Sequence, residues 1–139
     1  EHETIGGKLI PASINTNIVT KLLREELGYK HLAVTDDMEM GAILKHQPIE
    51  EAALKAFAAG EDMILICANA DSVRKSYQAL LDAFRREEFS LERLDESLVR
   101  IAEVKSLVKP PHEFDADRLQ ELSAEIARLN ENLNYSYGG

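Results

Sequence analysis

Two short, compact apolar runs constrain the fold of this chain more than any other feature of its sequence. They occupy residues 31–35 and 63–67, and their length suits strands that are buried on both faces of a sheet. Apolar residues at helical spacing before, between and after them predict helices over residues 14–27, 49–59 and 73–84. The order helix, strand, helix, strand, helix is typical of a parallel sheet with right-handed crossovers.

Two strands make an incomplete sheet, because each would leave one edge without a partner. The chain has 139 residues, whereas a whole (β/α)₈ barrel, the commonest closed form of this pattern, takes about 250. We therefore expect further strands to come from outside the printed sequence.

After Ser90 the pattern becomes purely helical. One apolar stripe runs from Leu91 to Val108, Pro110-Pro111 interrupts it, and a second stripe runs from Leu119 to Leu133 at 3-4-3-4 spacing. The last helix is expected to pack on the domain, and a partner helix is the alternative. We place the boundary between the two parts of the chain after residue 109.

Charge and composition exclude several classes of function. There are 16 Lys and Arg against 25 Asp and Glu, a net charge of −9, which argues against nucleic acid as a partner. No apolar run approaches the roughly 20 residues of a membrane span. The single cysteine, Cys67, excludes an internal disulfide and a clustered-cysteine metal site, and it fits a cytoplasmic location. The histidines have no partners at ligand spacing, so we expect no metal and no cofactor.

Asp36 and Asp37 are the best candidates for chemistry, because they follow the first predicted strand on the side where ligands bind in α/β folds. Adjacent residues of an extended chain point to opposite faces. One aspartate would enter a pocket and the other would brace the loop through backbone N–H groups. In the alternative, one caps the next turn and the other faces water. Met38 and Met40 line a pocket or plug the core, and composition favours the plug.

Five segments in order resemble the glycoside hydrolases of family 3, in particular their β-N-acetylhexosaminidase branch. The resemblance covers about residues 10–108. The segments are PAS at 11–13, LLREELGY at 22–29, VTDDMEMGA at 34–42, AGEDMIL at 59–65 and RLDESLVRI at 93–101.

The resemblance implies an α/β fold, the C-terminal portion of a (β/α)₈ TIM barrel with its last two βα units, followed by additional C-terminal helices. Residues 1–109 would be the C-terminal part of the catalytic barrel and residues 110–139 a helical extension. Asp36 matches the nucleophile of a retaining hydrolysis, and Asp37 and Met40 would contact the sugar. Many β-glucosidases of the family have tryptophan at the position of Asp37, so its presence resembles the hexosaminidase branch.

The branch typically takes its acid/base from a histidine paired with an aspartate on an earlier loop, beside a Lys-His-Phe-Pro-Gly-His-Gly type of segment. This sequence has no such segment. The resemblance therefore implies that the remainder of the barrel, from the same or another chain, supplies the acid/base. The implied substrate is a carbohydrate with a terminal β-linked N-acetylglucosamine.

Three alternatives accompany this interpretation. One is a phosphorylase of the same family, and another is a non-catalytic helical interaction module of hydrolase ancestry. The third is a signalling receiver domain that binds Mg²⁺ through paired acidic residues. The receiver needs about five strands and a later strand-end Asp and Lys, and the second strand ends instead in Cys67-Ala68-Asn69.

Overall fold

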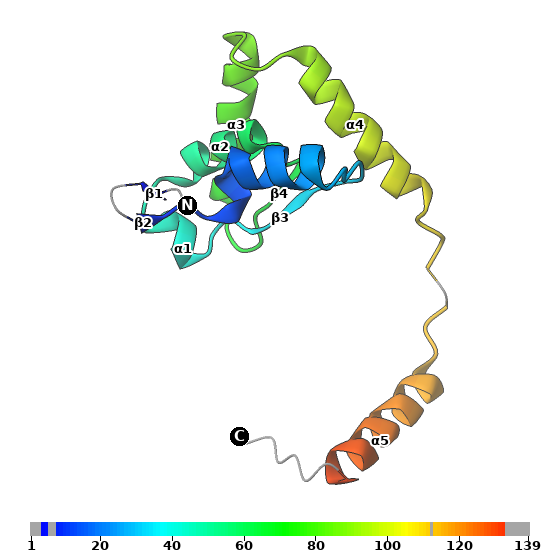
Figure 1. The fold of residues 1–139 in the computed structure, drawn as a ribbon. Coiled ribbons are helices and arrows are strands. Elements are labelled where there is room, and N and C mark those ends of the chain that lie inside the picture. Colours follow the sequence, from blue (N-terminus) through cyan, green and yellow to red (C-terminus); the bar gives the residue numbers. More distant parts are fainter. Residues whose placement is uncertain (1–3, 6–7, 112, 133–139) are drawn as a thin grey trace. The chain divides into compact units, whose positions relative to one another are not determined.

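The computed structural model describes residues 4–5, 8–111 and 113–132, and it divides into two compact units, Glu1–Val108 and Lys109–Gly139. In the first unit, β3 (Val34–Asp37) and β4 (Met63–Leu65) form a parallel pair (Figure 1). The predicted parallel arrangement is confirmed for these two strands. A short antiparallel hairpin of β1 (Thr4–Ile5) and β2 (Lys8–Leu9) precedes them.

The limits of β3 differ from the prediction of 31–35. The strand begins at Val34 and includes both aspartates, so the expectation that it ends before them is wrong. Val34 pairs with Met63 and Asp37 with Leu65, which gives β3 one extra residue between the two pairs. Such a bulge bends the strand and interrupts the alternation of its side chains. Regular alternation therefore does not place the side chains of Asp36 and Asp37 on opposite faces of the sheet.

Helix α2 (Ile49–Ala59) has the predicted limits and contacts most of the other elements of the first unit (Figure 1). Its alanines allow neighbouring elements to approach closely, and the side chains of Ala52, Ala53 and Ala56 are completely buried. The helix ends at Gly60, whose φ of 115° is a left-handed conformation that glycine adopts without strain. Met38 and Ile43, the latter from α1 (Gly41–Leu44), pack with α2 in the core.

The predicted helix over 14–27 is replaced by a 3₁₀ turn, η1 (Ala12–Ile14), and a π-helix, η2 (Asn17–Glu26). Ser13, which directly precedes the predicted helix, lies inside the 3₁₀ turn. Leu27 N–H donates to the Leu22 carbonyl at 2.9 Å, five residues back. A helix wound in this way no longer brings residues at 3.6-residue spacing onto one face. Of the predicted apolar stripe only Val19 is buried.

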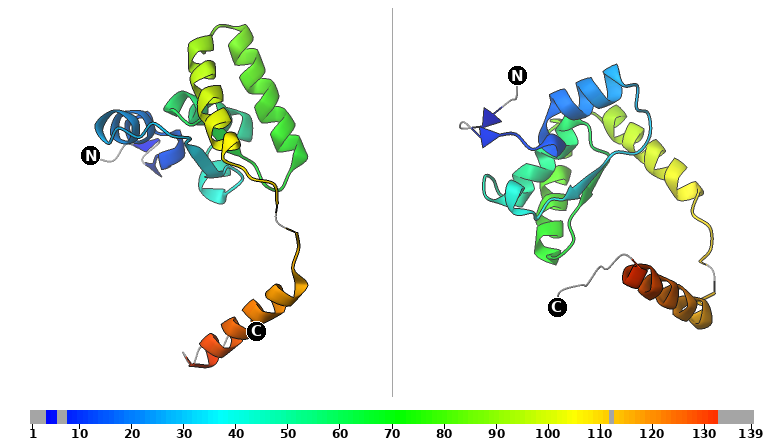
Figure 2. Two further views of the ribbon diagram at one scale, coloured as in Figure 1. Left: turned by 90° about the vertical axis from the view of Figure 1, so that its right-hand side faces the viewer. Right: turned by 60° about the horizontal axis from the view of Figure 1, so that its bottom comes forward.

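Helices α3 (Ala70–Arg85) and α4 (Leu91–Ser106) run antiparallel beside each other (left view of Figure 2). Helix α4 begins directly after Ser90, as predicted, whereas α3 begins three residues before the predicted start at 73. Asn69 and Ser90 cap the two helices by accepting hydrogen bonds from first-turn N–H groups. Three aromatic rings join α2, α3 and the turn that precedes α4, with centroids 5.0 to 5.6 Å apart. They belong to Phe57, Phe84 and Phe89.

One face of the β3–β4 pair is open to solvent. Val34 and Met63 are partners in register, and Leu65 follows Met63 by two residues, so their side chains share that face. They are 51%, 41% and 43% exposed. The expectation that both faces of these strands are buried is therefore wrong for this chain taken alone.

The second unit contains α5 (Ala116–Asn132). The side chain of Asp115, directly before the helix, accepts a hydrogen bond from the Arg118 N–H at 2.8 Å. Its apolar stripe includes Leu119, Leu122 and Ile126, and the predicted Leu133 lies outside the described residues. Packing of this stripe stays a prediction. Within the part of the chain that the structure describes, no helix is both long and apolar enough to cross a bilayer.

Candidate functional site

The carboxyl ends of β3 and β4 lie side by side and bring two loops together. Asp36 is exposed at the end of β3, and its Oδ1 accepts a hydrogen bond from the Asp37 N–H at 2.8 Å. The Met38 N–H donates to the Leu65 carbonyl at 2.9 Å, which continues the contact between the strands beyond Asp37. An accessible carboxylate on a fixed strand end is the arrangement that a carboxylate nucleophile needs.

Asp37 braces these loops. Its Oδ1 accepts hydrogen bonds from the N–H of Glu39 at 3.1 Å and of Cys67 at 3.3 Å. The prediction that one aspartate holds the loop through backbone N–H groups is confirmed, and that aspartate is Asp37.

The two methionines of the loop have different surroundings. Met38 is 1% exposed and lies in the core cluster, so the predicted plug is confirmed for this residue. Met40 is 48% exposed and directly precedes α1. Met40 is therefore the methionine that remains available to a ligand at this end of the sheet.

Glu39 is a participant that the sequence reasoning missed. Its Oε2 accepts hydrogen bonds from the N–H groups of Ala68 at 2.7 Å and Asn69 at 3.1 Å. The Ala68 hydrogen bond is the main cause that lowers the pKa of Glu39, and a hydrogen bond from Ser72 adds to it. Its partners lie 29 and 30 residues away in the sequence, so no local pattern indicates them.

Cys67 is an exposed thiol at the end of β4, beside these acidic side chains. Desolvation raises the pKa of the Cys67 thiol, and the nearby charges of Asp37, Glu39 and Asp36 raise it further. The thiol is thus held in its neutral form, which is the unreactive one. Among the described residues, no group of three or more His, Cys, Asp or Glu side chains is arranged to hold a metal ion.

A second charged cluster lies around Asp62, directly before β4. The Asp62 carboxylate is fully buried and accepts hydrogen bonds from Arg24, Arg100, the Ser97 hydroxyl and the Ala33 N–H at 2.7 to 3.0 Å. Arg93 lies 3.5 Å from the same carboxylate. We name these residues the Asp62 cluster.

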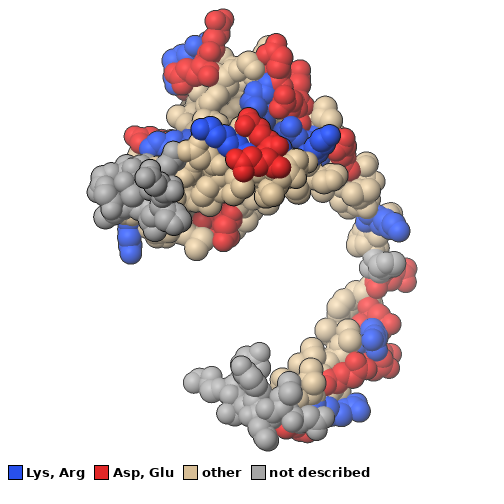
Figure 3. Space-filling model, viewed as in Figure 1, with Lys and Arg blue, Asp and Glu red and all other residues tan. Residues whose placement is uncertain are grey.

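Burial raises the pKa of Asp62, but the hydrogen bonds from Ala33, Ser97 and the arginines outweigh it, so the pKa is lowered overall. The arginines also hold the backbone, because Arg24 donates to the Gly60 carbonyl and Arg93 to the Glu61 carbonyl. The cluster thus joins η2, α4 and the residues that flank β3 and β4 through buried and part-buried hydrogen bonds. Figure 3 shows that basic and acidic side chains are interspersed on the surface of η2 and α4 that faces the viewer.

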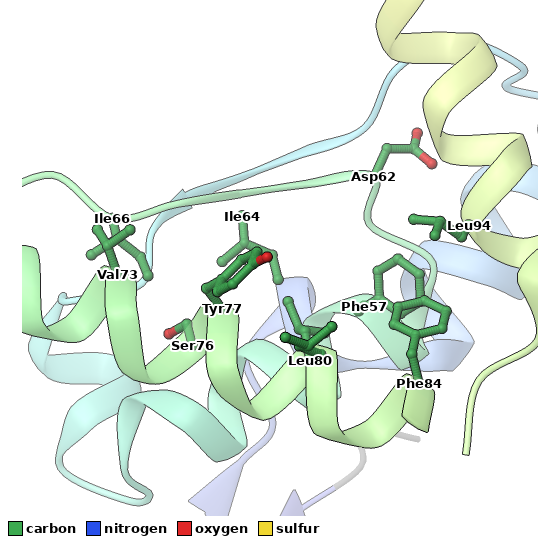
Figure 4. A pocket seen from close by; sticks show the side chains of 11 residues that line it. Phe57, Asp62, Ile64, Ile66, Val73, Ser76, Tyr77, Leu80, Phe84 and Leu94 are labelled. Carbon is green, nitrogen blue, oxygen red and sulfur yellow. The ribbon is translucent and has the colours of Figure 1, made fainter. Parts of the chain in front are cut away.

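An apolar concavity lies between α3, β4 and α4, and Asp62 is one of the residues that line it. It has a volume of about 420 Å³, and Figure 4 shows Tyr77 and Leu80 of α3 facing Ile64 of β4. Tyr77 belongs to the apolar stripe that predicts this helix, and it is 65% exposed. Asp36 does not line this groove, so the groove is separate from the candidate site.

Comparison with known proteins identifies relatives over most of the chain. A family model described as "Glycosyl hydrolase family 3 N terminal domain" matches residues 2–104. A beta-hexosaminidase A of Pseudoalteromonas piscicida is 34% identical over 129 residues, which are 88% of this chain and 20% of that protein. A beta-hexosaminidase of Vibrio cholerae serotype O1 (strain O395) is 29% identical over 89% of this chain and 34% of its own length.

A solved structure of the same family is also similar to this chain. The family 3 beta-N-acetylglucosaminidase from Paenibacillus sp. str. FPU-7 superposes with a TM-score of 0.71 and 34% identity, over 80% of this chain and 22% of that chain. The chain therefore spans between a fifth and about a third of the length of these relatives.

Proposed function

The chain belongs to glycosyl hydrolase family 3, and we propose that it is the C-terminal part of the catalytic barrel of a retaining exo-β-N-acetylglucosaminidase. The observation that carries the proposal is the position of Asp36, an exposed carboxylate at the carboxyl end of a parallel strand. Catalytic groups of (β/α)₈ enzymes lie at this end of the strands. The proposed class of sugar, an N-acetylhexosamine, is inferred from the relatives that are named beta-hexosaminidase.

In the proposed mechanism, the ionised Asp36 attacks the anomeric carbon of a terminal β-linked N-acetylglucosamine. The bond to the leaving oxygen breaks, and an acid from the rest of the barrel protonates that oxygen. The resulting ester between Asp36 and the sugar is then hydrolysed by water, which the same group deprotonates. Asp37 and Met40 are proposed to contact the sugar from the loop that follows the nucleophile.

The open face of the strand pair supports the presence of further barrel strands. Val34, Met63 and Leu65 are the kind of branched or long apolar side chains that fill the interior of such a barrel. Among the described residues, β3 and β4 pair only with each other, so each has an edge without a partner. We propose that residues 1–109 complete a barrel begun elsewhere and that 110–139 extend it.

The test is the rate of hydrolysis of an aryl N-acetyl-β-glucosaminide by the complete barrel protein and its Asp36→Asn variant. Asparagine keeps the size of the side chain but cannot act as the nucleophile, so we expect kcat to fall by at least about 10³-fold. A 2-fluoro analogue of the sugar should leave a covalent adduct on the peptide that contains Asp36. Full activity of Asp36→Asn, or an adduct on another residue, would show that the assignment is wrong.

Product analysis with and without inorganic phosphate separates hydrolysis from the phosphorylase alternative. We expect free N-acetylglucosamine under both conditions. A sugar 1-phosphate as the main product in phosphate would contradict the hydrolase assignment and leave the role of Asp36 intact.

A further inference from the structure

Glu39 joins the two loops at the carboxyl end of the strand pair. Its own N–H donates to Asp37 at 3.1 Å, and its carboxylate accepts the N–H groups of Ala68 and Asn69. Asp37 in turn accepts the N–H of Cys67. Three hydrogen bonds to two carboxylates therefore connect the loop after β3 with the loop after β4. We name this set of contacts the Glu39 clasp.

The clasp lies at the amino end of α3, which begins at Ala70. The first N–H groups of a helix lack partners within the helix and carry a partial positive charge, so a carboxylate is favoured beside them. Asn69 satisfies one of these groups with its side chain, and Glu39 satisfies the N–H groups of Ala68 and Asn69 just before the helix. These hydrogen bonds lower the pKa of Glu39, so its side chain is held as a carboxylate anion beside the start of α3.

The Glu39 clasp is connected to Asp36 by two hydrogen bonds. The Asp36 carboxylate accepts the Asp37 N–H, and the Asp37 carboxylate accepts the Glu39 N–H, so each acidic side chain fixes the backbone that carries the next. The last of them, Glu39, is attached to a sixteen-residue helix. The position of Asp36 thus depends on a chain of contacts that ends on a rigid element.

We propose that Glu39 is a positioning residue, whose carboxylate holds the loop of Asp36 against the start of α3 and thereby fixes the nucleophile. The proposal rests on the proposed function of Asp36. Glu39 itself would touch neither sugar nor leaving group. Its effect would arise because a displacement of about 1 Å in a reacting group costs roughly 10²-fold in rate.

The experiment compares Glu39→Ala, Glu39→Gln and Asp71→Asn in the complete barrel protein. Asp71 is a matched control, because it is an exposed carboxylate in the first turn of the same helix and pairs with Arg74 of that helix. For Glu39→Ala we expect kcat to fall about 100-fold while KM changes by less than about 3-fold. Asp71→Asn should retain the wild-type rate.

Glu39→Gln separates the loss of charge from the loss of the contact. Glutamine keeps an oxygen that accepts the two N–H groups without the charge, so its kcat should lie between those of the wild type and Glu39→Ala. A wild-type kcat in Glu39→Ala would overturn the proposal, and so would a rise in KM that explains the whole loss of kcat/KM.

Sodium formate gives a readout that general damage to the fold would not produce. Formate can occupy the space left by the Glu39 carboxylate at the start of α3, so it should raise kcat of Glu39→Ala about tenfold at fixed ionic strength, while sodium chloride does not. The wild type in formate is the control for direct attack of formate on the glycosyl-enzyme. Equal responses of the wild type and Glu39→Ala would overturn the proposal.

The Asp36→Asn variant, measured in the same series, distinguishes the two hypotheses. An inactive Asp36→Asn with a fully active Glu39→Ala would refute the positioning role and leave the proposed function intact. An active Asp36→Asn would refute the proposed function itself.

Discussion

The two ends of the short parallel sheet use carboxylates in opposite ways. Before β4, the Asp62 carboxylate is fully buried and receives hydrogen bonds from η2, from α4 and from the Ala33 N–H that precedes β3. At the carboxyl end of β3, the Asp36 carboxylate is exposed and accepts a hydrogen bond from the N–H of the next residue, Asp37. The first carboxylate is saturated by the protein, and the second remains accessible to a ligand.

The comparison shows how family motifs divide between stability and function. Residues of the segments 22–29, 59–65 and 93–101 meet in the Asp62 cluster, although they are far apart in the sequence. The segment 34–42 forms the other end, with Asp36 and the Glu39 clasp. In α/β barrels, residues at the amino ends of strands serve stability and those at the carboxyl ends serve catalysis.

The largest expected difference is in stability. Asp62→Asn in the complete barrel protein should lower the free energy of unfolding by about 3 to 5 kcal/mol, because three arginine side chains lose their buried counter-charge. Asp36→Asn should change it by less than about 0.5 kcal/mol, since the side chain is exposed. Urea unfolding measures both values. Equal effects of the two substitutions would contradict the division of roles.

Ser97→Ala tests one contact of the same cluster. The Ser97 hydroxyl is buried and donates to Asp62 at 2.8 Å, so its removal should cost about 1 to 2 kcal/mol in the free energy of unfolding. Ser123→Ala is the control, because its hydroxyl is exposed on α5 and donates only to a backbone carbonyl one turn earlier. That change should be neutral or slightly stabilising. If Ser97→Ala were as stable as Ser123→Ala, the hydrogen bond from Ser97 to Asp62 would not contribute to stability.

Local signals predicted much of the fold. The limits of α2 follow from its alanine-rich pattern and Gly60, and the start of α4 follows from Ser90, whereas the apolar spacing misses the first three residues of α3. The π-helix η2 could not be predicted in this way, because its i→i+5 hydrogen bonds leave no mark in apolar spacing. The bulge in β3 depends on its pairing with β4, which a local pattern does not contain.

The candidate site was predictable only in part. The position of Asp36 at a strand end followed from the sequence, whereas the clasp of Glu39 depends on partners 29 and 30 residues away. The Asp62 cluster is similar, since its arginines lie 38 residues before and 31 and 38 residues after the carboxylate. A useful signal was present: an acidic residue next to an apolar strand must find buried partners, because desolvation otherwise raises its pKa.

The smallest expected effect is a difference in how Glu61 and its neighbour Asp62 make stability depend on pH. Desolvation raises the pKa of Glu61, with Asp62 adding to the shift, although Arg24 and Arg93 oppose it. A carboxyl with a raised pKa in the folded state contributes stability below its unfolded value of 4.5 and loses it as the pH rises. Asp62 has a lowered pKa, so its contribution is present above 3.8 and is lost on acidification.

Glu61→Gln should therefore be more stable than the wild type at pH 7, and the advantage should disappear below pH 4.5, where Glu61 is protonated in both states. Asp62→Asn should show the reverse dependence, with its largest loss of stability at neutral pH, where the wild-type carboxylate is ionised. Urea unfolding of both variants and the wild type at pH 4 and pH 7 gives the comparison. If Glu61→Gln destabilised the protein at pH 7, the ionised Glu61 would belong to the stabilising cluster, and the arginines rather than desolvation would govern its pKa.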